Sequence, residues 1–218
     1  MDIRNRRIVF LGDSITEGHG TTGKDAFFTT LIARRCGAVC VNCGIGGTRI
    51  ARQEKPSINP RHDLDFPGRV AALDRDADIV GVFGGTNDYG HGDAPLGRFG
   101  DRTVYTFYGA LHVLYSSLLE KYPGALIFVM TPLHRLGEEN PKGDGIKERV
   151  SGTLRDYVNI IREVAEYYSL PVLDLFSVSG LQPAVPAIRE RYIPDGLHPN
   201  DAGHRVLADR IVGFLSAL

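Results

Sequence analysis

Cysteine is scarce in this sequence, with only Cys36, Cys40 and Cys43 among 218 residues. An odd and small number of cysteines argues against a disulfide framework. Cys40 and Cys43 form a C-x-x-C pattern, but a zinc site would need a second pair of ligands at matching spacing. If this segment is a strand, the odd separation places the two thiols on opposite faces. We therefore expect free thiols, buried or partly buried, and no metal site.

An excess of charge of either sign is also missing. Lys and Arg total 25 and Asp and Glu total 26, so the net charge is −1. This balance provides no electrostatic basis for binding nucleic acid or an anionic membrane. We expect a small-molecule partner, and the sequence leaves the oligomeric state open.

Long apolar runs are absent as well. No segment approaches the ~20 apolar residues that span a bilayer. The stretch Ile8–Leu11 is too short for a signal peptide, and no small-residue cleavage site follows it. We expect no stable membrane insertion, and the cytoplasm is the default location.

The composition that is present suits one α/β domain over residues 1–218. Hydrophobic residues make up 43% and charged residues 23%, as in soluble globular proteins. A chain of this length buries a core without disulfides or metal. We find no repeat, low-complexity tract or interdomain linker.

Short runs rich in Val, Ile and Phe alternate with longer stretches of helical periodicity. The runs are typical of strands buried on both faces of a parallel sheet. The expected strands are Arg7–Leu11, Ala38–Asn42, Asp78–Phe83, Ala125–Met130 and Pro171–Leu173. The expected helices are Asp25–Cys36, Pro67–Asp74, Arg102–Lys121, Val150–Tyr168 and Asp201–Leu218. This alternation predicts right-handed βαβ units and a mostly parallel sheet.

Two expected loops, Thr86–Asp101 and Pro132–Arg149, are longer than a connection requires. Both follow expected strands. They should therefore lie over the carboxyl edge of the sheet, where ligands bind in open α/β folds.

The segment Gly12-Asp13-Ser14 comes directly after the first expected strand. A serine in this place can present its hydroxyl at the sheet edge and its backbone N–H to a reacting oxygen. The hydroxyl is a weak nucleophile by itself and needs a base. A helix cap in a turn would explain the same residues.

Two further segments offer hydrogen-bond donors for an oxyanion. The glycines at 44, 46 and 47 follow the second expected strand, and glycine permits positive φ and close approach of the backbone. Asn87, in Gly85-Thr86-Asn87-Asp88, follows the third strand and can donate through its side chain. Taken alone, a flexible turn and an Asx-turn explain these segments as well.

The fourth segment, Asp195-Gly196-Leu197-His198, lies just before the last expected helix. A histidine with a near-neutral pKa suits a general base. A carboxylate three residues earlier can reach its Nδ1 atom and orient the ring. Seven histidines are present, so this pair alone would also fit a polar loop that ends in a helix cap.

The four segments together are more specific than any one of them. All fall where a strand ends or where a loop enters a helix, so all should lie along one edge of the sheet. Together they supply a nucleophile, a base, an orienting carboxylate and oxyanion donors, which is a complete set for acyl transfer.

With these motifs the sequence resembles the GDSL or SGNH hydrolase family. That family has a GDS motif near the N-terminus, a glycine after the second strand, a G-x-N-D motif and a C-terminal D-x-x-H motif. All four occur here in order and span nearly the whole chain, with Ile15 in place of the family's leucine. The resemblance implies a flavodoxin-like three-layer α/β/α sandwich with a five-stranded parallel sheet, and ester hydrolysis without a cofactor.

The resemblance also implies the roles of individual residues. Ser14 is the expected nucleophile and one oxyanion N–H, His198 the base and Asp195 its partner. Gly47 and Asn87 are the other expected oxyanion donors. The spacing from the second strand favours Gly47, while the glycines at 44 and 46 stay open as alternatives.

Two hypotheses from other functional classes compete with the esterase hypothesis. A non-catalytic binding member of the fold would usually lack the serine or the histidine, and neither is missing. A nucleotide- or flavin-binding protein would use the glycine-rich turn at residues 12–20. That turn lacks both phosphate-loop spacings and places Asp13 and Glu17 where phosphate would sit.

The substrate is less constrained than the chemistry. A lipase would be expected to expose an apolar lid, whereas both long loops are polar. This favours a short acyl group, such as acetyl, on a polar or carbohydrate alcohol; lipid acylhydrolase or thioesterase activity is the alternative. His134 and Arg135 follow the fourth strand and, with Asp13, are candidate substrate contacts, although Asp13 and Asp88 also look like loop-stabilising carboxylates.

Overall fold

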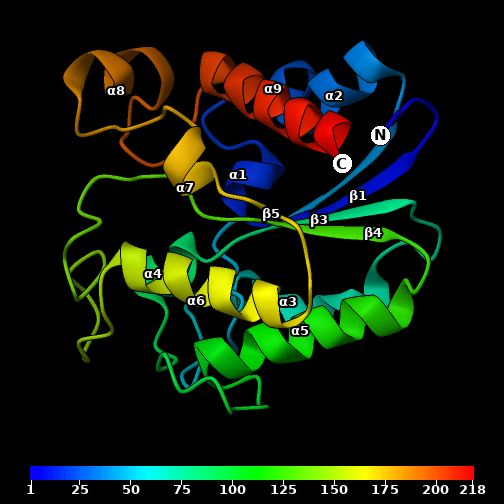
Figure 1. Ribbon diagram of the computed structural model, residues 1–218. Coiled ribbons are helices and arrows are strands. Elements are labelled where there is room, and N and C mark those ends of the chain that lie inside the picture. The colour runs from blue at the N-terminus through cyan, green and yellow to red at the C-terminus, as the bar shows by residue number, and fades with distance from the viewer.

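The computed structural model describes residues 1–218 and consists of a parallel sheet between two layers of helices (Figure 1). The strands are β1 (Arg7–Gly12), β2 (Val39–Gly44), β3 (Ile79–Phe83), β4 (Leu126–Met130) and β5 (Val172–Leu173). Their order is β2-β1-β3-β4-β5, and every neighbouring pair is parallel. The predicted five-stranded parallel sheet and α/β fold are confirmed.

The helices cover both faces of this sheet. They are α1 (Ser14–Glu17), α2 (Phe28–Cys36), α3 (Phe66–Arg69), α4 (Thr86–His91), α5 (Phe107–Lys121), α6 (Leu154–Tyr167), α7 (Leu175–Val178), α8 (Pro186–Tyr192) and α9 (Asp201–Ala217). Helices α2 and α9 lie over one face, and α3, α5 and α6 lie over the other (Figure 1). None of the helices combines the length and the apolar character needed to cross a bilayer.

The core is divided by the sheet into two clusters of 29 and 20 buried residues. Side chains alternate between the faces of a strand, and β1 shows this directly. Val9 and Leu11 pack on the α5 and α6 side, whereas Ile8 and Phe10 pack on the α2 and α9 side. The period-two pattern of each central strand therefore builds both halves of the core.

Strand β2 departs from the prediction of burial on both faces. It is an edge strand, and its first residue, Val39, is 49% exposed. Cys40 packs against one cluster and Cys43 against the other, as their odd separation predicts. Both are free, half-buried thiols, and burial raises the pKa of Cys40 to about 12.

Helix boundaries differ from the predictions where capping residues define them. Helix α5 begins at Phe107 because the Thr106 side chain accepts a hydrogen bond from the Gly109 N–H. Helix α6 begins at Leu154, after a capping box between Thr153 and Asp156. Helix α4 occupies the start of the segment predicted as a long loop, since its sequence TNDYGH carries no apolar periodicity to reveal it.

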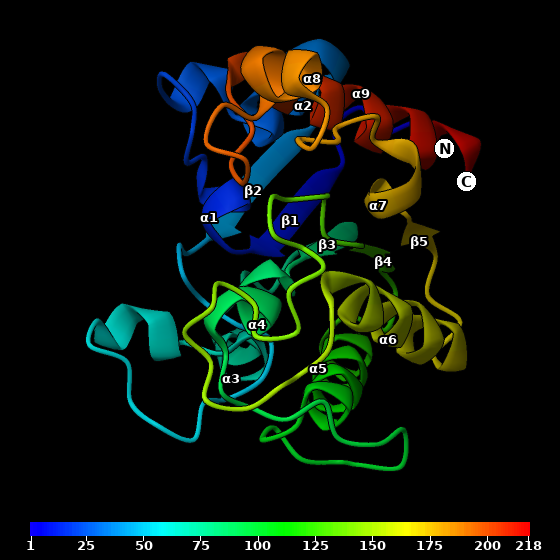
Figure 2. The same cartoon turned by 90° about the vertical axis from the view of Figure 1, so that its left-hand side faces the viewer.

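The order of the strands also determines where a ligand can bind. From β1 the chain passes outward to β2 and then crosses to β3 on the opposite side of β1. The two connections leave in opposite directions, so a crevice opens beyond the carboxyl ends of β1 and β3. Helices α1 and α4 begin at those two ends and face the viewer together in Figure 2.

Candidate active site

Ser14 is held at the carboxyl end of β1 by a tight strand-to-helix turn. A side chain at Gly12 would collide with Thr16, so only glycine lets the strand turn directly into α1. Asp13 caps this helix by accepting a hydrogen bond from the Ile15 N–H at 3.0 Å. Ser14 is thereby the first residue of α1, where a backbone N–H has no intrahelical acceptor.

The hydroxyl of Ser14 meets a histidine from the other end of the chain. Its Oγ lies 3.1 Å from Nε2 of His198, and Nδ1 of His198 lies 2.7 Å from Oδ2 of Asp195. The second oxygen of Asp195 accepts the backbone N–H groups of Leu197 and His198 at 2.8 and 2.7 Å. The structure therefore brings together the three residues predicted as a triad.

The electrostatics of this group follow from its hydrogen bonds. Partial burial raises the pKa of Asp195, but the backbone N–H and the ring of His198 outweigh that effect and hold the pKa below its ordinary value. Asp195 is thus charged at neutral pH and accepts the Nδ1 proton of His198. The Nε2 lone pair is then free to accept the Ser14 proton.

The three candidate glycines differ in what their N–H groups already bind. Gly44 donates to the Asn42 side chain at 2.9 Å, and Gly46 donates to Oε2 of Glu17 at 2.6 Å. The N–H of Gly47 makes no hydrogen bond within the protein. Gly47 has φ +75°, and a Cβ atom there would collide with the ring of His62.

Asn87 lies in the first turn of α4 with 5% of its surface exposed. Its Nδ2 donates to the Thr48 carbonyl at 3.0 Å, which occupies one of the two amide N–H groups. Its Oδ1 lies 3.2 Å from Nε2 of His91. The next residue, Asp88, accepts the backbone N–H groups of Ile50 and Ala51, both at 2.8 Å, and so binds α4 to the segment after β2.

The remaining predicted residues have contacts of their own within the fold. Burial raises the pKa of Asp13 to about 7 despite the hydrogen bond from Ile15. His134 contacts Glu138 at 2.8 Å, and Arg135, which is 7% exposed, donates to the Thr86 carbonyl at 3.3 Å. These contacts show Asp13 as a cap and the other two as loop supports, and a role toward substrate stays a prediction for all three.

Several residues near the triad were given no role in the esterase site from the sequence. His19 has its ring 5.5 Å from that of His198, and Glu17 forms an ion pair with Arg61 as well as holding Gly46. The four-residue spacing from Asn87 to His91 would have placed both on one face, had this segment been recognised as a helix.

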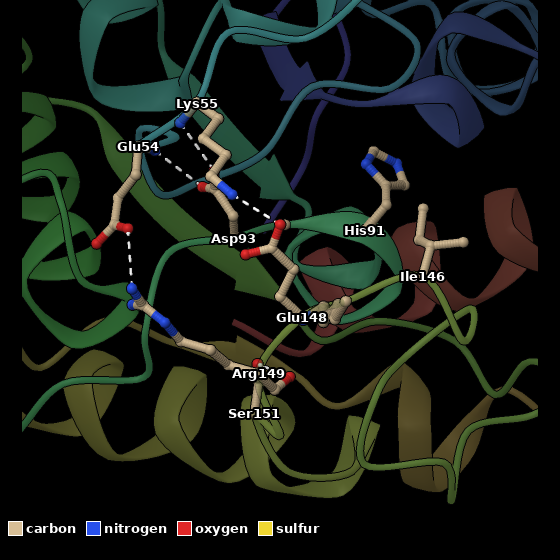
Figure 3. Close-up of a pocket in the computed structure, with 10 residues that line it drawn as sticks. Glu54, Lys55, His91, Asp93, Ile146, Glu148, Arg149 and Ser151 are labelled. Carbon is tan, nitrogen blue, oxygen red and sulfur yellow. Dashed lines mark hydrogen bonds and ion pairs between the residues drawn. The ribbon is translucent and has the colours of Figure 1, made fainter.

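A groove of about 630 Å³ adjoins the site through His62 and His91, and only two of its twelve lining residues are hydrophobic. A smaller pocket of about 190 Å³ continues from it past His91 and Asp93 (Figure 3). Figure 3 shows Asp93 accepting the backbone N–H groups of residues 54 and 55 and Lys55 paired with Glu148. The groove and the pocket beside His91 are therefore bordered mainly by charged and polar residues.

Comparison with known proteins identifies the family. The model of the GDSL-like lipase/acylhydrolase family matches residues 10–206. One solved structure is 34% identical with a TM-score of 0.86, covering 100% of this chain and 99% of its own. A Lactobacillus plantarum protein is 31% identical with a TM-score of 0.83, covering 99% of this chain and 98% of its own.

A more distant structure, a two-domain esterase active on acetylated mannans, is 20% identical with a TM-score of 0.67; the match covers 97% of this chain and 48% of that one. The comparison with curated proteins finds no match. The family match over almost the whole length agrees with the motifs and with the Ser14–His198 contact. The chain belongs to the GDSL-like lipase/acylhydrolase family and is a carboxylic ester hydrolase.

Proposed function

We propose that this chain is a serine esterase that removes short acyl groups, above all acetyl, from a polar or carbohydrate alcohol. The observation that carries the proposal is the continuous chain of contacts from Ser14 Oγ to His198 Nε2 at 3.1 Å and from His198 Nδ1 to Asp195 at 2.7 Å. A nucleophile, a base and an oriented carboxylate in this geometry are the requirements of acyl transfer.

The reaction proceeds in two steps. Ser14 Oγ bonds to the ester carbonyl carbon as its proton passes to His198 Nε2, and the charged Asp195 stabilises the resulting imidazolium. The tetrahedral intermediate collapses, the carbon–oxygen bond to the alcohol breaks, and His198 returns the proton to the leaving alkoxide. Water then repeats the sequence on the acyl-enzyme and frees Ser14.

Three donors border the place where the carbonyl oxygen becomes an oxyanion. They are the N–H of Ser14, the N–H of Gly47 and the second amide N–H of Asn87. Support for Gly47 comes from its neighbours, because the N–H groups of Gly44 and Gly46 are already bound within the protein. Preorganised donors of this kind are the largest single contribution to catalysis in many acyl-transfer enzymes.

The polarity of the groove supports the choice of alcohol. Ten of its twelve lining residues are not hydrophobic, and a lipid chain placed there would desolvate charged groups such as Arg49, Asp93 and Asp144. Hydroxyl groups of a sugar would find both donors and acceptors on its walls. The activity of the distant two-domain structure on acetylated mannans is of the same kind.

The test is hydrolysis of p-nitrophenyl acetate, butyrate and octanoate, and of acetylated sugars, by the wild type and by Ser14→Ala. We expect activity to be highest on acetate and to fall to background in the variant. Ser216→Ala is the matched control, because that hydroxyl only donates to Val212 within α9. Equal rates for the wild type and Ser14→Ala would refute the mechanism, and a preference for octanoate would refute the short acyl group.

A further inference from the structure

A second group of residues beside Asn87 has no part in the triad. Asn87 can serve as an oxyanion donor only if its amide nitrogen, and not its oxygen, faces the substrate. We propose that Arg49 and His91 are positioning residues that hold the Asn87 amide in that orientation. This inference rests on the proposed serine esterase function.

The series of hydrogen bonds that orients the Asn87 amide begins at Arg49, whose guanidinium is held by neighbouring side chains and is almost fully buried. Its side chain is 6% exposed, and its Nη2 donates to the Ser57 hydroxyl at 2.9 Å. Asp63 lies 3.5 Å from Nη1 and accepts the hydroxyl and the backbone N–H of Ser57 at 2.6 and 2.9 Å. These contacts leave the Arg49 Nε–H directed at Nδ1 of His91, 3.2 Å away.

The protonation of His91 follows from this contact. A guanidinium nitrogen can only donate, so Nδ1 of His91 must be the unprotonated, accepting nitrogen. The ring proton of neutral His91 therefore lies on Nε2, which donates to Oδ1 of Asn87 at 3.2 Å. Burial lowers the pKa of His91 to about 4, with Arg49, His62, Arg135 and Lys147 acting in the same direction, so the ring is neutral at neutral pH.

The hydrogen bond that His91 donates to Oδ1 determines the orientation of the Asn87 amide. With Oδ1 bound to His91, Nδ2 must point the other way, where it donates to the Thr48 carbonyl at 3.0 Å. A flipped amide would set its nitrogen against the Nε2–H of His91 and its oxygen against the carbonyl of Thr48. Both contacts would then be repulsive, so an obligate donor and an obligate acceptor enforce one orientation.

His91 and Thr48 act on opposite ends of the same amide. Removal of His91 leaves only the Thr48 carbonyl to select the orientation, and leaves Oδ1 of Asn87 without its partner. The expected cost is a fall in kcat of about 10-fold or more, limited by the roughly 10²–10³-fold cost of losing the donor altogether. KM should change little, because the interaction strengthens as the oxyanion forms.

The test compares His91→Leu with His91→Gln, each in the wild type and in Asn87→Ala. Glutamine can accept from Arg49 through its oxygen and donate to Asn87 through its nitrogen, so we expect it to restore most of the kcat that leucine loses. In the Asn87→Ala background, His91→Leu should have no further effect on kcat. The proposal would be overturned if the losses of kcat from His91→Leu and Asn87→Ala multiplied in the double variant. It would also be overturned if His91→Gln were as slow as His91→Leu.

A second measurement needs no ester and no activity. Long-range ¹H–¹⁵N NMR spectra of labelled protein distinguish the two neutral tautomers of histidine, and the His91 signals are assigned by their loss in His91→Gln. We expect the Nε2–H tautomer at neutral pH, and the Nδ1–H tautomer would refute the inference. If Ser14→Ala stayed active while His91 showed the Nε2–H tautomer, the esterase mechanism would fail and this arrangement would stand.

Discussion

The two halves of the active site are built in different ways. The base half consists of Asp195 and His198, three residues apart in one loop, with side chains 54% and 21% exposed. Its hydrogen bonds, apart from the one to Ser14, run within that loop. The proposed oxyanion half consists of the Gly47 turn and Asn87 on α4, and Asn87 is buried.

Helix α4 is held by segments that are distant in the sequence. Nζ of Lys147 donates to the Asp88 carbonyl at 2.7 Å, and the hydroxyl of Tyr89 donates to the Asn140 carbonyl at 3.0 Å. The backbone N–H of Asp144 donates to the Gly90 carbonyl at 2.8 Å. A local loop can lose a side chain without disturbing the core, whereas a buried helix with distant partners cannot.

The base half should therefore separate catalysis from stability. We expect His198→Ala to lower kcat/KM by about 10⁴-fold or more, because no other group accepts the Ser14 proton. Its free energy of unfolding should stay within about 0.5 kcal/mol of the wild type, since the lost contacts are local and partly solvated. Steady-state kinetics and urea unfolding measure the two quantities.

His19→Ala is the matched control for His198→Ala, because the ring of His19 lies 5.5 Å from that of His198 without contacting Ser14. We expect it to keep kcat/KM within about 10-fold of the wild type. A loss in this control as large as in His198→Ala would show that the two variants disturb the same loop and would remove the contrast.

The oxyanion half should show smaller losses of activity that come with a loss of stability. Gly47→Ala forces a side chain into the ring of His62 at a positive φ. We expect kcat to fall by up to about 10²-fold as the N–H is displaced, with a cost of about 1–2 kcal/mol in stability from the left-handed backbone. Activity assays and urea unfolding test both effects.

Gly180→Ala separates the effect of the left-handed backbone from the effect of the collision with His62. Gly180 has φ +76°, nearly that of Gly47, but a Cβ atom there meets nothing within 4 Å. This variant should lose stability alone, and His62→Ala should restore part of the activity of Gly47→Ala. Equal activity losses in Gly47→Ala and Gly180→Ala would contradict the assignment of this N–H.

The smallest effect on activity is expected for a buried histidine on α9, the helix that follows the loop of Asp195 and His198. His204 is fully buried in α9 and accepts the Phe28 N–H at 3.1 Å, and burial lowers its pKa from 6.5 to about 4. Between these values the unfolded chain binds more protons, so the contribution of this group to stability is full above pH 6.5 and is lost as the pH falls toward 4.

His204→Gln removes this titration. The variant should be less stable than the wild type at pH 7, and the gap should close by about 3 kcal/mol as the pH falls through that window. His91→Gln should behave in the same way on the oxyanion half, because the pKa of His91 is also lowered to about 4. Unfolding titrations from pH 7 to pH 4 measure the gap, and a constant difference would contradict the neutral state of these rings.

The difference between the two halves also explains which parts of the site could be predicted from the sequence. The pairing of Asp195 with His198 depends on a spacing of three residues, so it is visible in the sequence. The strand ends that place Ser14 and Asn87 at one edge follow from the alternation of strands and helices. The helical state of α4 and the role of His91 left no local signal, because polar residues dominate that segment and its stability comes from residues near positions 50 and 140.

The sequence by itself determined the parallel sheet, the two-sided core, the family and the residues that meet at the sheet edge, because periodicity and motif order are properties of the chain. The tertiary structure decided which hydrogen-bond partner each donor at that edge has. Asn42 and Glu17 occupy the N–H groups of Gly44 and Gly46 and leave that of Gly47 free, and Arg49 sets the tautomer of His91. Each donor and acceptor can serve only a limited number of partners, and those partners are chosen by the fold rather than by neighbours in the sequence.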